Sequence, residues 1–155
     1  MPSRLMNKEI PFIHFQDLTK QFRQGPVVLE GLNLDVLKGE FISLIGPSGC
    51  GKSTILRLLS GLLDITSGKI VVDGMTPENA REESFFVFQE PNLLPWLRVQ
   101  QNVEVPLKIS GAPKGDRQER ASRMIELVGL KDAAGKYPWQ LSGGMKMRVS
   151  IARAL

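Results

Sequence analysis

The sequence has little of the chemistry that marks secreted, metal-binding or nucleic-acid-binding proteins. Its only cysteine, Cys50, cannot form an internal disulfide, and no Cys and His residues stand at the spacing of a zinc site. Aromatic residues make up 6% of the chain and the basic residues are scattered, so we expect no nucleic-acid partner. The net charge of +4 is too small to choose among other anionic partners.

Long apolar runs are also missing. Residues 1–9 lack the apolar core of a signal peptide, and the most apolar stretch, residues 55–63, is short and interrupted by Arg57. We therefore expect a chain that neither spans a membrane nor is exported, and that works in a reducing compartment. Apolar residues still make up 42% of the 155 residues, which is enough for the core of one domain.

The first half of the chain carries strand patterns. Alternation of apolar and polar residues predicts strands at residues 12–15 and 32–36. Residues 41–45 are almost wholly apolar, which is typical of a strand buried on both faces of an α/β sheet. We expect a largely buried helix over residues 53–63, because leucine and isoleucine cover most of its surface.

Two more strands are expected before the pattern changes to helices. Residues 70–72 predict a strand that ends in an Asp73-Gly74 turn, and residues 85–88 predict another. Prolines and helical periodicity follow, with Gly129 as the expected C-cap of the clearest helix. A last helix is expected from residue 145 to the end of the chain.

A phosphate-binding pattern, Gly-x-x-x-x-Gly-Lys-Ser/Thr, spans residues 46–53. It lies between an expected strand and a helix N-terminus, where backbone N–H groups and the positive end of the helix dipole bind phosphates. Lys52 would reach the β- and γ-phosphates of a nucleoside triphosphate, and the Ser53 hydroxyl would ligate Mg²⁺. The candidate phosphate-binding residues are Gly46, Pro47, Ser48, Gly49, Cys50, Gly51, Lys52, Ser53 and Thr54.

The phosphate-binding pattern leaves the reaction open. A glycine-rich turn without a ligand is the alternative, although a chance match in this context should be rare. Cys50 is better interpreted as a small filler of a variable loop position than as a reactive or regulatory thiol. Because such a loop specifies triphosphate binding alone, kinases, GTPases, helicases and transport ATPases all stay possible.

A second glycine-rich segment, Leu141-Ser142-Gly143-Gly144, precedes the last expected helix. The Ser142 hydroxyl and the N–H groups of Gly143 and Gly144 can face a γ-phosphate, and Ser142 can equally be an ordinary N-cap. Together with the phosphate loop, this segment resembles the signature motif of ABC transporter ATP-binding subunits. The resemblance implies an α/β fold, the ABC type of P-loop NTPase, with a mixed core sheet, an antiparallel β-subdomain and a helical subdomain.

The resemblance extends to two further positions. Gln89 matches the Q-loop glutamine, which in the family ligates Mg²⁺, helps to order the attacking water and couples to the membrane domain. Phe22 matches the aromatic residue that stacks on adenine. A lone glutamine is usually a surface residue and Phe22 could be an ordinary core residue, so only the family assigns them these roles. Lys52 and Gln89 become the catalytic candidates, and Ser53 and Gln89 the metal ligands.

The resemblance also organises the chain as a nucleotide-binding domain over residues 1–155. It places an ATP-binding core with the β-subdomain at residues 1–88 and a helical subdomain at 89–140. The signature motif and its helix take residues 141–155.

Two departures from the family concern activity. Met145 and Met147 replace glutamines, which would remove side-chain hydrogen bonds and tune the site without abolishing it. The family also places a strand ending in Asp-Glu, and later a switch histidine, after the signature helix, whereas this chain ends at Leu155 and has only His14. We therefore expect an incomplete fold, poorly stable alone, in which hydrolysis is very slow.

Residues 88–96 and 137–140 resemble ATPases of nitrate, sulfonate and taurine importers. This resemblance implies a subunit on the inner face of the cell membrane that couples ATP binding and hydrolysis to solute import. It implies a homodimer in which Ser142, Gly143 and Gly144 bind ATP in trans, a transmembrane permease that docks near Trp96, and a periplasmic substrate-binding protein. The alternative is a short ATP-binding partner without hydrolysis of its own; a P-loop kinase would leave residues 141–144 unexplained.

Overall fold

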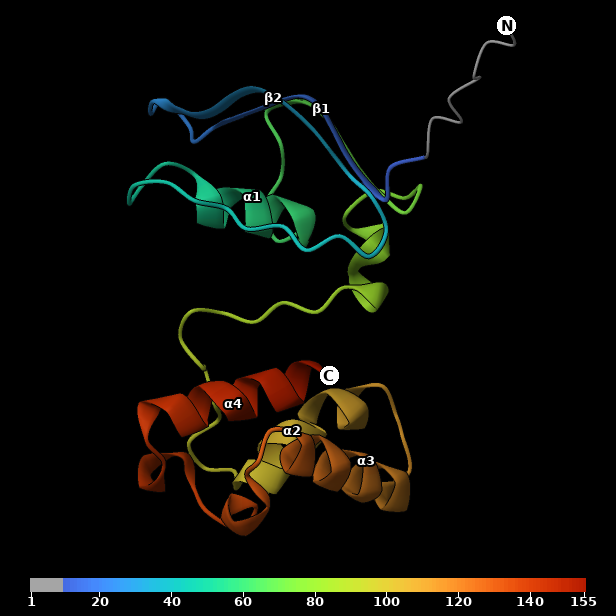
Figure 1. Ribbon diagram of the computed structural model, residues 1–155, viewed down its shortest axis with the longest axis vertical. Helices are drawn as coiled ribbons and strands as arrows, with labels where there is room; N and C mark the ends of the chain where they lie inside the picture. Colours follow the sequence, from blue (N-terminus) through green and yellow to red (C-terminus); the bar gives the residue numbers. More distant parts are fainter. Residues whose placement is uncertain (1–9) are drawn as a thin grey trace, which may run out of the picture. The chain divides into compact units, whose positions relative to one another are not determined.

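The computed structural model describes residues 10–155, without the side chains of residues 82 and 83. The chain divides after Ser84 into two compact units, and each is described by itself (Figure 1). No helix in this described part combines the length and hydrophobicity needed to cross a bilayer.

The first unit is built on a three-stranded antiparallel sheet with the strand order β2-β1-β3. Its strands are β1 (Ile13–Gln21), β2 (Val27–Val36) and β3 (Ser67–Val72). The strands predicted at residues 12–15 and 32–36 are confirmed, but both run further than the alternation indicated. In β1 the buried Phe15 and Leu18 are three residues apart because a bulge interrupts the ladder between them.

The turn after β3 forms as the sequence predicted. Asp73 and Gly74 have φ values of 47° and 76°, and the backbones of Val72 and Met75 exchange two hydrogen bonds of 2.9 Å. Positive φ at both central residues is the conformation of a two-residue hairpin turn.

Helix α1 (Lys52–Leu59) is shorter and less buried than predicted. Gly61 takes a φ of 60°, and the N–H groups of Gly61 and Leu62 donate to the carbonyls of Leu58 and Arg57. These bonds terminate the helix in a left-handed glycine cap, inside an apolar run whose periodicity predicted continuation. Only Leu58 of the helix is buried, so the expectation of a largely buried helix over residues 53–63 was wrong.

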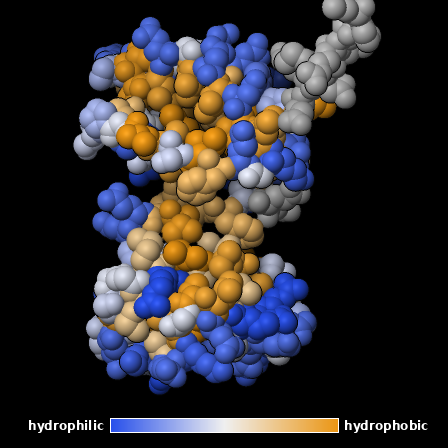
Figure 2. Space-filling model, in the orientation of Figure 1, coloured by the Kyte–Doolittle hydropathy of each residue, from blue (hydrophilic) through white to orange (hydrophobic). Residues whose placement is uncertain are grey.

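Residues 41–45 and 85–88 do not form the strands predicted for them. Phe41 and Ile45 are 94% and 93% exposed, and Phe85 is 70% exposed. A buried strand needs a hydrogen-bonded neighbour and an element over each face, and none of the strands β1 to β3 pairs with either segment. Figure 2 shows apolar side chains on the surface of both units.

The second unit is helical. It contains the helices α2 (Val99–Ile109), α3 (Lys114–Leu127) and α4 (Gly143–Ala154). Two 3₁₀ turns, η2 (Lys131–Ala133) and η3 (Pro138–Gln140), lie between α3 and α4. A further 3₁₀ turn, η1 (Asn79–Glu83), belongs to the first unit. Gly129, with a φ of 68°, ends α3 as predicted: the Gly129 and Leu130 N–H groups donate to Glu126 and Ile125.

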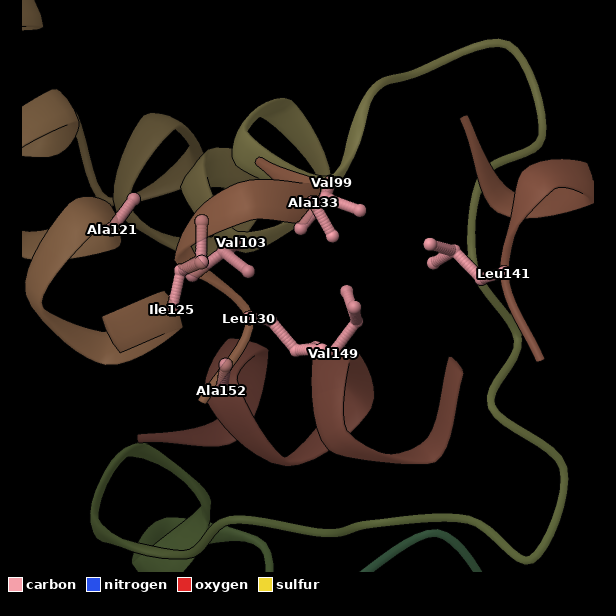
Figure 3. Close-up of a cluster of buried hydrophobic side chains, with 9 residues drawn as sticks. All are labelled: Val99, Val103, Ala121, Ile125, Leu130, Ala133, Leu141, Val149 and Ala152. Atoms are coloured by element: carbon pink, nitrogen blue, oxygen red, sulfur yellow. The ribbon is translucent and has the colours of Figure 1, made fainter. Parts of the chain in front are cut away.

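The core of the helical unit joins all three helices (Figure 3). Val149 and Ala152 of α4 point toward the side chains supplied by α2 and α3. Full burial of a valine, leucine or isoleucine side chain contributes about 1.5–3 kcal/mol. The cluster comprises Val99, Val103, Ala121, Ile125, Leu130, Ala133, Leu141, Val149 and Ala152.

Candidate functional site

The phosphate loop curls around its own lysine. The Lys52 Nζ donates hydrogen bonds to the carbonyl oxygens of Gly46, at 2.8 Å, and Pro47, at 2.7 Å. The left-handed conformations of Gly49 and Gly51, with φ of 83° and 96°, turn the backbone into α1. The ammonium group is thereby held against the loop, at the N-terminal end of the helix.

Gly51 lets this loop pack directly on the sheet. A Cβ on Gly51 would lie 2.8 Å from Leu29 Cδ2 and 3.3 Å from Val28 Cγ1, both on β2. A Cβ on Gly46 would lie 2.7 Å from the Cys50 Sγ. At Gly51, where φ is 96° as well, another residue would be strained, whereas at Gly46 a Cβ would require the Cys50 side chain to rotate away.

The start of α1 is open to an anion and to a cation bound with it. Ser53 is exposed, Thr54 is half-buried, and the first turn holds no acidic side chain that would neutralise the helix dipole. The described residues contain no cluster of three or more His, Cys, Asp or Glu side chains. Mg²⁺ prefers oxygen ligands and is commonly held by one or two protein groups together with substrate phosphates, so Ser53 fits a nucleotide-bound Mg²⁺.

Phe22 lies at the same end of the first unit as the phosphate loop. The β1–β2 ladder ends at the pair Gln21 and Val27, and Val28, the next residue of β2, touches the position of Gly51. The ring is 43% exposed, so Phe22 is not an ordinary core residue. The Lys20 Nζ lies 4.9 Å from the ring centroid, within the range of a cation–π contact.

Ser142 is the N-cap of α4. Its Oγ accepts a hydrogen bond from the Met145 N–H at 3.3 Å, and Gly143 and Gly144 are exposed in the first turn. The capping role expected for Ser142 is confirmed. Its hydroxyl and the exposed glycine backbone lie together at the positive end of the helix.

The candidate residues are divided between the two units. Phe22 and the phosphate loop belong to the first unit, whereas Gln89 and the signature segment belong to the second. Gln89 is exposed, in an irregular segment that precedes α2. The structure thus groups the loop with Phe22, and leaves the contribution of Gln89 and Ser142 to the same nucleotide as a prediction.

Two polar residues that the sequence did not single out hold the segment after Gln89. Asn102 is fully buried in α2 and makes hydrogen bonds to the backbone of residues 94, 97 and 98. Arg153 of α4 donates to the carbonyls of Asn92 and Pro91, 61 and 62 residues away in sequence. Burial lowers the pKa of the Arg153 guanidinium from its ordinary value, yet arginine stays protonated in proteins. A long-range contact of this kind leaves no local sequence signal.

The same segment borders a concave, aromatic surface. Trp96 is 69% exposed, Trp139 is 65% exposed, and Tyr137 stacks on Trp139 with ring centroids 4.3 Å apart. Of these aromatic residues, Trp139 lines a pocket of about 440 Å³, together with Glu90, Pro91, Asn92, Leu93, Pro95, Pro138 and Lys146.

Known proteins resemble this chain in sequence. A family model described as "ABC transporter" matches residues 29–155. The chain is 49% identical over 142 residues to the aliphatic sulfonates import ATP-binding protein of Agrobacterium fabrum. This match covers 91% of this chain and 48% of that protein. The chain is 42% identical to the nitrate import ATP-binding protein of Synechococcus elongatus, of which it covers 58%. The chain thus spans about half the length of the curated relatives it matches.

Solved structures resemble the fold. A dimeric ATP-binding cassette in a post-hydrolysis state, bound to ADP and Pi, superposes with a TM-score of 0.83 at 35% identity. The match covers 92% of this chain and 68% of that one. The predicted P-loop NTPase fold of the ABC type is therefore confirmed.

Proposed function

Since this chain belongs to the ABC transporter family, we propose that it binds ATP with Mg²⁺ and forms part of a subunit that couples ATP hydrolysis to solute import. The observation that carries this proposal is the phosphate loop itself. It ends at a helix N-terminus free of acidic side chains, and its Lys52 ammonium is held against the loop backbone.

Each residue of the loop has a part in ATP binding. Backbone N–H groups between Gly46 and Ser53 would surround the phosphates, and Lys52 would exchange its carbonyl partners for β- and γ-phosphate oxygens. Thr54 adds a phosphate contact from the first turn of α1. The exposed Phe22 ring would stack on the adenine from the neighbouring turn.

Hydrolysis requires water to attack the γ-phosphorus in line with the leaving oxygen. Mg²⁺, when bound, would neutralise the negative charge that develops on the phosphate oxygens. Ser53 and Gln89 would hold it, Gln89 would orient the water, and Lys52 would stabilise the transferring group. Lys52 and Gln89 are therefore the proposed catalytic residues of this chain.

The partners follow from the two separate glycine-rich segments. We propose a homodimer in which Ser142, Gly143 and Gly144 of one copy face the γ-phosphate held by the other. The permease would dock on the surface around the exposed side chains of Trp96 and Trp139, the second of which lines a pocket. A periplasmic substrate-binding protein would select the solute, and the dimer would work on the inner face of the membrane. Nitrate-, sulfonate- or taurine-like solutes are the proposed cargo.

This function divides the chain into three working segments. We propose that residues 1–88 form the ATP-binding core and β-subdomain, residues 89–140 the helical subdomain, and residues 141–155 the signature segment. The chain divides into its two compact units after Ser84, four residues before the first of these boundaries.

Replacing Lys52 by alanine should weaken ATP binding about 20-fold. The expectation follows from the loss of charge-assisted hydrogen bonds to phosphate, worth about 1.5–3 kcal/mol. Isothermal titration with ATP and Mg²⁺ measures the affinity. Lys69→Ala, which removes an exposed lysine from β3 of the same unit, is the matched control and should bind as the unaltered protein does. Equal losses in both variants would show that the phosphate loop is not the site.

Introducing Ser142→Arg should abolish ATP-dependent dimerisation, because a long cationic side chain would occupy the place of the partner's γ-phosphate. Light scattering after size-exclusion chromatography, with and without ATP, measures the change in mass. Ser122→Arg places the same side chain on an exposed position of α3 and should leave dimerisation intact. Unchanged dimerisation of Ser142→Arg would contradict the trans arrangement. Binding without turnover in the unaltered protein would support the alternative of an ATP-binding partner.

A further inference from the structure

We propose that Arg153 is a positioning residue for Gln89: from the last turn of α4 it fixes the backbone that follows Gln89 and so sets where that side chain points. The inference rests on the role in Mg²⁺ binding proposed for Gln89. It assigns a function to a residue outside the phosphate loop and outside the signature segment.

The Arg153 guanidinium makes hydrogen bonds to two consecutive peptide units. The Arg153 Nη1 donates to the Asn92 carbonyl oxygen at 2.9 Å, and its Nη2 donates to the Pro91 carbonyl oxygen at 3.1 Å. The planar guanidinium presents both N–H groups in one fixed fork, so the two carbonyls cannot rotate independently. Pro91 stands two residues after Gln89, and its own φ is fixed by the ring.

The segment has no regular secondary structure to hold it in place. Asn92 has a φ of 45°, in the left-handed region that asparagine adopts more readily than most residues other than glycine. Gln89 and Glu90 lie in irregular, exposed backbone. The described side chains offer Arg153 no carboxylate, so its hydrogen bonds serve the two carbonyls alone.

Helix α4 connects the Arg153 contact to the signature segment. The helix carries Ser142 as its N-cap and Arg153 in its last turn, and its 12 residues span about 18 Å. Val149 and Ala152 anchor it in the core of the unit (Figure 3). One packed element therefore holds both the signature segment and the segment after Gln89 in fixed positions relative to each other.

Arg148 provides a matched control on the same helix. Its Nη1 donates to the Val128 carbonyl at 3.0 Å and to the Gly129 carbonyl at 3.5 Å, beyond the end of α3. Arg148→Ala removes the same charge and a similar pair of backbone contacts, without touching the segment after Gln89.

A nitroxide label tests the contact directly. In a Cys50→Ala background, which removes the only thiol, Glu90→Cys places the label beside Gln89 on an exposed residue. We expect the label in Arg153→Ala to tumble at least about twofold faster than in Arg148→Ala. The label in Arg153→Lys should have a mobility between those in the unaltered Arg153 protein and in Arg153→Ala, because one ammonium group cannot span both carbonyls as the guanidinium does. Equal mobility in Arg153→Ala and Arg148→Ala would overturn the proposal.

A magnesium titration tests whether Arg153 acts through Gln89. The Mg²⁺ concentration that half-saturates ATP-dependent binding should rise about tenfold in Arg153→Ala and in Gln89→Ala, as for other residues that orient a metal ligand. The double variant should rise no further than Gln89→Ala alone. If the rise in the double variant equalled the product of the rises in the two single variants, the two residues would act independently, which would contradict the proposal. Absence of ATP binding in the unaltered protein would instead overturn the proposed function, while the nitroxide comparison would still decide the role of Arg153.

Discussion

Replacing Asn102 by alanine is expected to destabilise the helical unit by about 3–4 kcal/mol. The Asn102 side chain is fully buried and bonds both to the Leu94 N–H, at 2.8 Å, and to three carbonyls. Its Nδ2 donates to Leu94, Leu97 and Arg98 at 3.1, 3.0 and 3.2 Å. Each buried group left without a partner costs about 1–3 kcal/mol, and water can reach only some of them.

Two further variants separate hydrogen bonding from packing at Asn102. Asn102→Asp keeps the shape and the acceptor oxygen but places an oxygen opposite the three carbonyls, so it should destabilise at least as much as alanine. Gln101→Ala, on the neighbouring exposed residue, removes only the cap on the Arg98 N–H and should cost about 1 kcal/mol. Urea unfolding followed by tryptophan fluorescence reports on this unit, because Trp96 and Trp139 both belong to it. An Asn102→Asp variant as stable as the unaltered protein would show that packing alone matters.

Gly68→Ala is expected to destabilise the sheet of the first unit by about 3 kcal/mol. Gly68 has a φ of 87°, and a Cβ there would lie 2.4 Å from the Asp17 carbonyl oxygen and 2.6 Å from that of Gln16. The left-handed conformation costs about 1–2 kcal/mol for other residues, and pushing a strand away from such an overlap costs about 1–3 kcal/mol more. The bulge in β1 brings these carbonyls toward β3, so neither strand can move without breaking the ladder.

Gly74→Ala is the matched control for Gly68→Ala. Gly74 also has a positive φ, 76°, but a Cβ there would meet nothing within 4 Å. Gly74→Ala should therefore destabilise the sheet only by the cost of the left-handed conformation, about 1 kcal/mol. Hydrogen exchange of peptides from β1 and β3 measures both variants, since a loss of 3 kcal/mol accelerates exchange about 150-fold in amides that open with the sheet. Similar effects at the two glycines would contradict the role of the close approach at Gly68.

The features predicted correctly from the sequence are those that a few adjacent residues control. The Asp73-Gly74 turn, the glycine cap at Gly129 and the N-cap at Ser142 each depend on local φ values and on side chains within three residues. The phosphate loop belongs to the same group, because its glycine spacing sets the path of the backbone around Lys52. These signals also sufficed to identify the family.

The wrong predictions concern pairing and burial. Residues 41–45 have the composition of a buried strand, but composition does not supply the neighbouring strand whose backbone must complete the ladder. Apolar periodicity carried the predicted α1 to residue 63, whereas Gly61 stops the helix and only Leu58 reaches the core. For Phe22 the sequence left core and surface open, and its exposure beside the turn decided between them.

The sequence by itself determined the family, the phosphate loop, the turns and the helix ends, because these depend on local backbone preferences and on motifs of adjacent residues. The tertiary structure alone revealed which side chains hold the segment after Gln89, and which apolar residues are buried. Arg153 and Asn92 are 61 residues apart in sequence, and their contact exists only because packing of α4 in the helical core brings the guanidinium to that carbonyl. Burial and long-range hydrogen bonds are properties of segments brought together by folding, and no local pattern encodes their partners.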